Sequence, residues 1–397
     1  MQETIMEREA PAHTFTFKGD GGGYFLICLV NTLLCIITLG VYFPWALMKC
    51  RRYIYSNMYL NGQSFSYKVT GGDIFLSWFL LMVIYITGLV TTIKYPVIGL
   101  AILGALLLSV PVLFTKSLQY QAIQTSLNGV RFGFRCGALR AFWNLLALPG
   151  LLVVAFGGVM VALALLLIEG SGNVIFLAVA LALTWLIGLI VISGLAWHRL
   201  MLIVGEGGSF GIHRFRVQVS LRYCIKTMMI GAGILVPFFA LMGYMTFSLC
   251  QSIIGESDAG LSSEQVEMLI YTRYYGKYLL IQLVYIFGVA VMSSYLAVAF
   301  RNHFLNNLQL ADGQIRFRST LTWHGMVYRL GALLVISAIS CGLAWPLLRV
   351  WLIGWVAENT SVVGDLDALE LTDSDEVVDN GLLSRLSRGV MPGLIFI

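Results

Sequence analysis

Six long apolar stretches, arranged as three consecutive pairs, limit what this chain can fold into. Each has about 20 residues or more, the length that an α-helix needs to cross the hydrocarbon core of a bilayer. Helices satisfy their own backbone hydrogen bonds and are therefore stable in lipid. We expect three pairs of membrane-spanning helices, over residues 74–93 with 96–118, 142–168 with 174–197, and 228–250 with 278–300.

Charged residues are scarce and unevenly placed. They make up 11% of the chain, against about 25% in soluble domains. Lysine and arginine gather in four segments, around residues 49–68, 116–140, 199–226 and 301–329. Because short basic loops stay in the cytoplasm, we expect these segments inside and the three connections between them outside. This topology accounts for the cations without a nucleic-acid partner.

Two of the basic segments contain a β-hairpin signature. The stretches LNGQSFSY, at residues 60–67, and LNGVRFGF, at residues 127–134, combine an Asn-Gly turn with alternating aromatic residues. Related patterns, complete or half-complete, begin at Phe15, Gly205, Leu310 and Ala357. Their recurrence predicts repeated supersecondary units. The strands would all lie on the basic side, where they are able to pair into a sheet.

The first and last apolar units are shorter, and each contains a helix break. Gly40 precedes Pro44 by four residues, and Gly342 precedes Pro346 by four. Glycine relaxes the backbone, while proline removes a donor and clashes with the preceding turn. Two topologies follow: a kinked span that puts the terminus outside, or a helical hairpin whose tip is the break and whose ends both lie inside. We favour the hairpin, because it puts every predicted strand on one side.

The sequence therefore predicts an all-α polytopic membrane protein of repeated helical hairpins, with short cytoplasmic β-strands between them. It has a cytoplasmic N-terminal segment with one strand (1–23), a membrane domain of five helical-hairpin repeats (24–358) and an acidic C-terminal tail (359–397). We expect the acid-rich part of the tail to stay solvated.

Several motifs resemble those of a known family. The stretches FTFKGDGGGYF, NTLLCIITLGVYFPWA and LNGQSFSY are similar to motifs of the YjgN-like family of bacterial inner-membrane proteins. The resemblance covers essentially the whole chain, and the run at residues 38–45 is specific. It implies that the protein lies in a bacterial inner membrane. It brings no catalytic residues, because the family has no established activity.

Polar residues inside apolar segments are the first candidates for function. Trp45, Lys49 and Arg52 share one helical face with Ser56, and this basic, aromatic stripe suits a phosphate headgroup. The plainer alternative is a basic anchor with an interfacial tryptophan. Arg349, in the last apolar stretch, is either a headgroup or substrate anchor, or a side chain that reaches toward the interface.

No catalytic or metal-binding pattern stands out. The five histidines form no paired ligand motif, the seven cysteines are scattered, and no nucleophile motif is present. We expect a protein that is not an enzyme and that has no cofactor. Two functions remain open: transport or lipid handling, with a lipid or small molecule as cargo, or a non-catalytic scaffold that binds partner proteins. In both, the lipid bilayer is a partner and nucleic acid is not.

Overall fold

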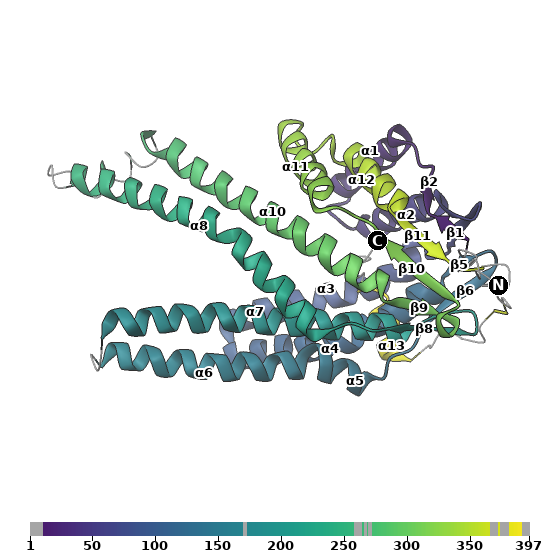
Figure 1. Ribbon diagram of the computed structural model, residues 1–397, viewed down its shortest axis with the longest axis horizontal. Coiled ribbons are helices and arrows are strands. Elements are labelled where there is room, and N and C mark those ends of the chain that lie inside the picture. The colour runs from purple at the N-terminus through teal and green to yellow at the C-terminus, as the bar shows by residue number, and fades with distance from the viewer. Residues whose placement is uncertain are drawn as a thin grey trace, which may run out of the picture.

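The strands gather at one end of the molecule and the helices extend away from it (Figure 1). The computed structural model describes residues 11–169, 173–257, 264–265, 268, 272–365, 372–373 and 381–390. Within these residues the helices form five consecutive pairs, and short strands connect one pair to the next.

The three central pairs contain the long helices. They are Gly71–Lys94 (α3) with Pro96–Ile123 (α4), then Ala138–Phe142 (α5), the π-helical turn Trp143–Ala147 (η1) and Leu148–Ile168 (α6) with Val174–Gly207 (α7), and Leu221–Ser257 (α8) with Tyr275–Asn306 (α10). Six candidate spans of 24 to 35 residues are long and apolar enough to cross a membrane. The prediction of a polytopic membrane protein is confirmed.

The two terminal pairs are shorter. They are Gly21–Ile37 (α1) with Phe43–Ser56 (α2), and Trp323–Ile339 (α11) with Trp345–Glu358 (α12). The first helix of each pair has 17 residues and the second has 14. At 1.5 Å per residue these extend about 26 Å and about 21 Å, less than the ~30 Å hydrocarbon core of a bilayer.

The break in each terminal pair is a tight turn that reverses the chain. Leu39 and Gly40 have positive φ angles of 49° and 88°, and Cys341 and Gly342 repeat them at 50° and 87°. The N–H of Gly40 donates to the carbonyl of Cys35 at 2.7 Å, which is the Schellman arrangement that ends many helices. The two helices of each terminal pair pack against each other. Each pair therefore has the form of a helical hairpin, the arrangement that the sequence analysis favours over a kinked span.

The second helix of each terminal pair starts in the same way. The backbone N–H just before it donates to Thr38 Oγ1 at 3.1 Å in the first pair and to Ser340 Oγ at 3.0 Å in the last. Pro44 and Pro346 occupy the second helical position, where no intrahelical donor is required. In both motifs, then, the glycine ends one helix and the proline starts the next.

The strands form one sheet of 11 strands; the sequence predicted short strands able to pair, but not a sheet of this size. In chain order they are Ala12–Thr14 (β1), Thr16–Phe17 (β2), Met58–Leu60 (β3), Gln63–Tyr67 (β4), Thr125–Leu127 (β5), Val130–Phe134 (β6), Gly208–Phe210 (β7), His213–Val217 (β8), Leu308–Leu310 (β9), Ile315–Ser319 (β10) and Thr360–Val363 (β11). All neighbouring strands are antiparallel, and a short 3-10 turn, Ala311–Gly313 (η2), joins β9 to β10.

This sheet almost closes into a barrel. The first strand, β1, pairs with the last, β11, while β2 pairs with β3, and only Phe15 separates β1 from β2. Closure leaves few backbone groups unpaired at sheet edges. The Asn-Gly turns lie where the sequence predicts them, with φ of 49° and 77° at Asn61 and Gly62, as a type I′ hairpin requires.

The interior of the sheet is apolar. One aromatic residue from each of five predicted patterns lies there: the half-buried rings of Phe15, Phe65, Phe132, Phe215 and Phe317 pack against a buried apolar cluster that includes Phe210. The rings of Phe15 and Phe65 stack with centroids 6.2 Å apart. Small barrels are commonly filled by side chains in this way.

The helices form a ring beyond the sheet. From α1 to α12 each described helix packs against the next, and α12 packs against α1. The pairs α6–α7 and α8–α10 diverge as they leave the sheet (Figure 1). Only 0% to 22% of each span's most apolar window is buried within the protein, so most of the span surface is available to lipid.

Part of the C-terminal tail packs on the protein itself. A short helix, Leu382–Ser387 (α13), contacts α3 and α4. The hydroxyl of Ser77 donates to the carbonyl of Arg385 at 2.5 Å, and that of Ser117 donates to the carbonyl of Val390. The expectation of a solvated acid-rich stretch falls mainly on residues 366–371 and 374–380, which lie outside the described residues.

Candidate functional site

Trp45 is a packing residue between α2 and α3. Its ring lies 4.9 Å from the ring of Phe75, centroid to centroid. A Cβ on Gly71 would come within 2.6 Å of the Trp45 Cα, so the glycine permits the two helices to approach closely. These contacts are packing contacts between helices, and they do not bear on the predicted headgroup role of Trp45.

Arg52 holds a backbone carbonyl that follows a strand. It donates to Val69 O at 3.0 Å, two residues after β4 ends. Equivalent carbonyls after two other strands have partners of the same kind: Asn302 donates to Leu321 O at 2.9 Å, and His198 Nε2 lies 3.2 Å from Val219 O. The matching contacts assign Arg52 a local structural role.

Lys49 and Arg349 are exposed basic residues within the short helices α2 and α12. The Lys49 ammonium lies 5.4 Å from the centroid of the Tyr42 ring. The Arg349 side chain makes no hydrogen bond or ion pair with another described residue, and it lies near Tyr24 of α1.

The structure does not bring the four predicted residues into one site. Trp45 and Arg52 face the connection between β4 and α3, whereas Arg349 is near α1. The terminal hairpins are nevertheless neighbours, because α1 packs against both α2 and α12. Lys49 and Arg349 therefore belong to adjoining hairpins.

A polar seam lies between α1 and α2. The side-chain amide of Asn31 donates to Ala46 O at 3.3 Å and to Cys50 Sγ at 3.6 Å. Cys28 Sγ lies 3.8 Å from Cys50 Sγ. Asn31 thus makes an interhelical hydrogen bond. The proximity of the two cysteines depends on the fold of the hairpin, which their scattered positions do not reveal.

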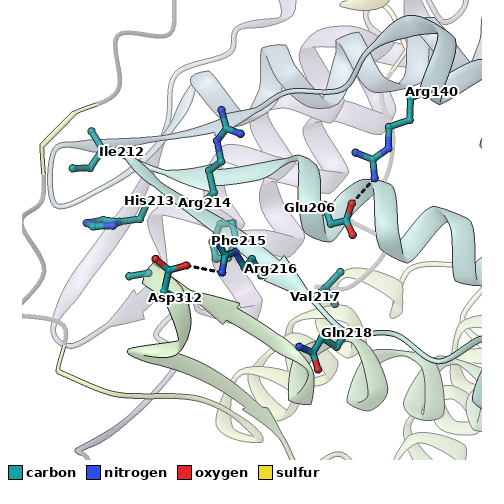
Figure 2. Close-up of a pocket in the computed structure, with 11 residues that line it drawn as sticks. Arg140, Glu206, Ile212, His213, Arg214, Phe215, Arg216, Val217, Gln218 and Asp312 are labelled. Carbon is teal, nitrogen blue, oxygen red and sulfur yellow. Dashed lines mark hydrogen bonds and ion pairs between the residues drawn. The ribbon is translucent and has the colours of Figure 1, made fainter.

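A cleft of about 620 Å³ lies beside β8, and we call it the β8 cleft. Polar residues from four parts of the chain line it (Figure 2). Arg140 lies on α5, and Glu206 lies near the end of α7. Arg214 and Arg216 lie on β8, Gln218 directly follows β8, and Asp312 lies on η2.

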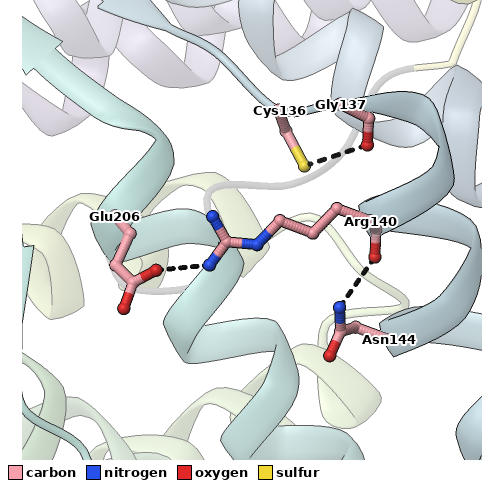
Figure 3. Close-up of polar contacts among 5 residues, drawn as sticks. All are labelled: Cys136, Gly137, Arg140, Asn144 and Glu206. Atoms are coloured by element: carbon pink, nitrogen blue, oxygen red, sulfur yellow. Dashed lines mark hydrogen bonds and ion pairs between the residues drawn. The ribbon is translucent and has the colours of Figure 1, made fainter.

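Two ion pairs cross the β8 cleft. Arg216 pairs with Asp312 at 2.7 Å, and Arg140 pairs with Glu206. Local bonds hold the backbone of α5 near Arg140: its carbonyl accepts from the side-chain amide of Asn144 at 2.8 Å (Figure 3). Burial raises the pKa of the neighbouring Cys136 thiol, and the positive charge of Arg140 opposes that rise.

Arg214 also lines the cleft, two residues before Arg216 on β8 (Figure 2). Its side chain is exposed and makes no ion pair or hydrogen bond with another described residue. The sequence placed Arg140, Arg214 and Arg216 in basic segments, where they were interpreted only as signals of topology. Their proximity depends on the pairing of β6, β7, β8 and β9, which joins segments far apart in the chain.

Comparison with known proteins places the chain in a family. Residues 12–381 match the model of a family described as bacterial protein of unknown function (DUF898). The chain belongs to this family. It is 44% identical to inner membrane protein YjgN of Escherichia coli O157:H7 over 401 residues, and 44% identical to that of Salmonella typhimurium strain LT2 over 403 residues, with 100% of each chain covered. No solved structure matches.

The family assignment confirms the resemblance seen in the motifs. It also confirms the predicted location, because the relatives, including one from Escherichia coli K12 at 43% identity, are named inner membrane proteins. Together with six membrane-competent helices, this makes the chain a polytopic inner-membrane protein. The family description gives no activity.

Proposed function

We propose that this protein handles membrane lipid at its terminal hairpins. The observation that carries the proposal is the adjacency of two hairpins too short to span a bilayer, each with an exposed basic side chain within its second helix. These side chains are Lys49 on α2 and Arg349 on α12. The contact between α1 and α12 makes the two hairpins one continuous short region.

Hydrophobic mismatch gives this region a physical effect. Beside a short hydrophobic segment the bilayer thins or its headgroups descend. Arg349 lies about 6 Å from the tip end of α12 and about 14 Å from its sheet end, at 1.5 Å per residue. A bare cation in the hydrocarbon core costs about 2.5–3.5 kcal/mol or more. A phosphate headgroup that binds Arg349 and Lys49 removes this cost. It thereby lowers the barrier to lipid movement along the two terminal hairpins.

Transport of a polar substrate is less well supported. The sheet interior is apolar, and the spans have apolar windows with few charges. We further propose that the sheet and its basic segments face the cytoplasm, as the positive-inside rule favours. The five helical hairpins are then repeats of one unit, which the matching tips of the terminal pairs support.

Native mass spectrometry and a lipid-translocation assay test the proposal together. The protein is released from nanodiscs that contain phosphatidylglycerol and phosphatidylcholine, and in parallel is reconstituted into vesicles with a fluorescent phospholipid. In the K49Q/R349Q variant we expect at least fivefold less retained phosphatidylglycerol and slower translocation. Arg52 is left intact because it bonds Val69.

The matched control is K94Q/K277Q. These two lysines also lie beside tyrosine rings, but at the far ends of α3 and α10. The control removes the same charge and should behave as the wild type. Equal lipid retention and equal translocation in both double variants would remove the terminal hairpins from the function.

A scaffold function is the second candidate, and the docked tail supports it. Asp373 accepts from the backbone N–H of Arg131 at 3.1 Å and from its Nε at 2.8 Å. Arg131 of β6 thus binds an acidic side chain of this chain's own tail, and an acidic partner protein would use the same chemistry. A photo-crosslinker at position 131 in cells, with the tail deleted from residue 365, tests this: a reproducible protein adduct supports a scaffold, and its absence counts against one.

A further inference from the structure

We propose that the β8 cleft binds a phosphate-bearing ligand. This site is separate from the terminal hairpins, and the inference does not depend on their role in lipid handling. It rests on three arginines that line one cleft (Figure 2), of which the Arg214 side chain has no hydrogen-bond or ion-pair partner among the described residues.

Strand geometry sets the spacing of two of the arginines. Arg214 and Arg216 alternate with half-buried and buried residues, so both project from the outer face of β8. Residues two apart on a strand are about 6.8 Å apart. Arg216 lies opposite Gln309 of β9, and Arg214 opposite Ser209 of β7. These two cross-strand neighbours are neutral, so the carboxylate that Arg216 meets is that of Asp312, while Arg214 has a neutral neighbour across the strand.

The charge of the cleft favours an anion. Three arginines face two carboxylates, Glu206 and Asp312, which leaves one net positive charge among these five side chains. Both ion pairs are solvent-exposed, at 73% and 76% for Arg216 and Asp312 and at 53% and 40% for Arg140 and Glu206. Exposed pairs of this kind contribute little to stability. A multivalent anion that binds Arg214 can therefore also engage Arg140 or Arg216 at little cost.

Guanidinium chemistry and size point to phosphate. The planar guanidinium fork binds phosphate oxygens in a bidentate manner and keeps its charge at any physiological pH. A cleft of about 620 Å³ is within the usual range of about 300–1,000 Å³ for small-molecule sites. It can hold a phosphate group together with an attached organic part.

The position of the cleft leaves two sources for that phosphate. Arg140 lies near the start of the span formed by α5 to α6, and Glu206 lies near the end of α7. The cleft is therefore at the boundary between the spans and the sheet. Both a soluble phosphate compound and the headgroup of an anionic lipid can reach it.

The test compares R214Q with R318Q in the full-length protein. Arg318 is also an exposed arginine on a strand, β10, but it does not line the cleft. The proteins are held in nanodiscs of phosphatidylcholine and titrated with pyrophosphate, with sodium chloride at matched ionic strength as the blank. Thermal unfolding is the readout, because a ligand that binds only the folded state raises its stability.

We expect saturable stabilisation of the wild type and of R318Q, and binding at least tenfold weaker in R214Q. Phosphatidylglycerol nanodiscs form the second arm. If they occupy the cleft, pyrophosphate no longer stabilises the wild type, while R214Q loses the extra stability that phosphatidylglycerol gives; this supports the site and identifies a lipid source. Continued stabilisation by pyrophosphate there supports the site with a soluble source. No saturable effect in phosphatidylcholine, or equal weakening in R214Q and R318Q, overturns the proposal. The unliganded melting temperatures show that both variants fold.

Discussion

The central and terminal helix pairs leave the same sheet but differ in length and in where their charges lie. α7 has 34 residues and α10 has 32, whereas α12 has 14. The central spans carry their cations near their ends, as Lys94 and Lys277 do. The short hairpins carry cations within their helices as well. Arg329 of α11 lies 4.8 Å and 4.2 Å from the ring centroids of Trp351 and Trp355.

This difference is the basis of the proposal that the central spans anchor the protein and the terminal hairpins handle lipid. A span with charges only at its ends is held in the bilayer by its apolar surface, and it needs nothing else from the protein. A charge within a short hairpin requires an aromatic partner, as Arg329 has, or an anionic one. Arg349 has no such partner among the described residues, and this is why the lipid proposal centres on it.

The largest predicted effect is at the tip of a central pair. A Cβ on Gly99 would lie 2.4 Å from the backbone nitrogen of Thr92, so Gly99→Leu forces the two helices apart. We expect a loss of about 3 kcal/mol in stability, measured as the midpoint of thermal unfolding in detergent. Gly104→Leu, also in α4 but with open space around it, is the control and should be nearly neutral.

A buried arginine gives the next effect. Arg301 of α10 is 9% exposed and donates to Ser319 Oγ at 2.8 Å and Thr360 Oγ1 at 2.9 Å. Arg51 of α2, the matching position before the helix end, is only partly buried and donates to Gln121 Oε1 at 2.7 Å. We expect R301M to cost about 2 kcal/mol and R51M about half as much. Equal unfolding midpoints would contradict the idea that the two pairs differ in burial at the sheet.

A side chain at the tip of a terminal hairpin is destabilising for a different reason from one at the tip of a central pair. Gly40 has open space around it but a φ of +88°, so the strain of a left-handed conformation is the whole cost of a side chain. We expect G40A to lose about 1–2 kcal/mol, and G342A the same. Gly233→Ala, in the helix α8 with nothing within 4 Å, should cost nothing. A loss as large as that of Gly99→Leu would mean that the tip is packed.

The smallest effect concerns the β8 cleft. The Arg216–Asp312 pair is exposed at 73% and 76%, so D312N should change stability by less than about 0.5 kcal/mol. The same substitution frees Arg216 and should tighten pyrophosphate binding. A large loss of stability would show that the pair is structural, and the cleft would then be part of the sheet's framework.

Local patterns made much of this fold predictable. The spans follow from apolar length, the β-hairpins from Asn-Gly turns, and the helical tips from a glycine that ends one helix and a proline that starts the next. Each depends on residues within a few positions of one another. The matching Gly40–Pro44 and Gly342–Pro346 motifs even have matching backbone angles.

The rest depends on contacts between distant parts of the chain. Closure of the sheet requires β1 to pair with β11, more than 340 residues later. The β8 cleft joins Arg140 to Asp312 through the pairing of β6, β7, β8 and β9, and the polar seam joins Cys28 to Cys50 through the fold of one hairpin. No local pattern encodes these pairings. The aromatic residues that fill the sheet were visible as a motif, but their common interior was not.

The most direct test of the account is the side of the membrane on which the first strand and the middle of the sheet lie. In a cysteine-free background, His13→Cys on β1 and Ile212→Cys in the exposed turn between β7 and β8 are treated with a membrane-impermeant maleimide, from outside intact cells and then on inverted vesicles. A closed sheet served by short, re-entrant hairpins predicts that both positions react only in inverted vesicles. Reaction of position 13 in intact cells, with position 212 still protected, would make α1 and α2 a single span and contradict the account.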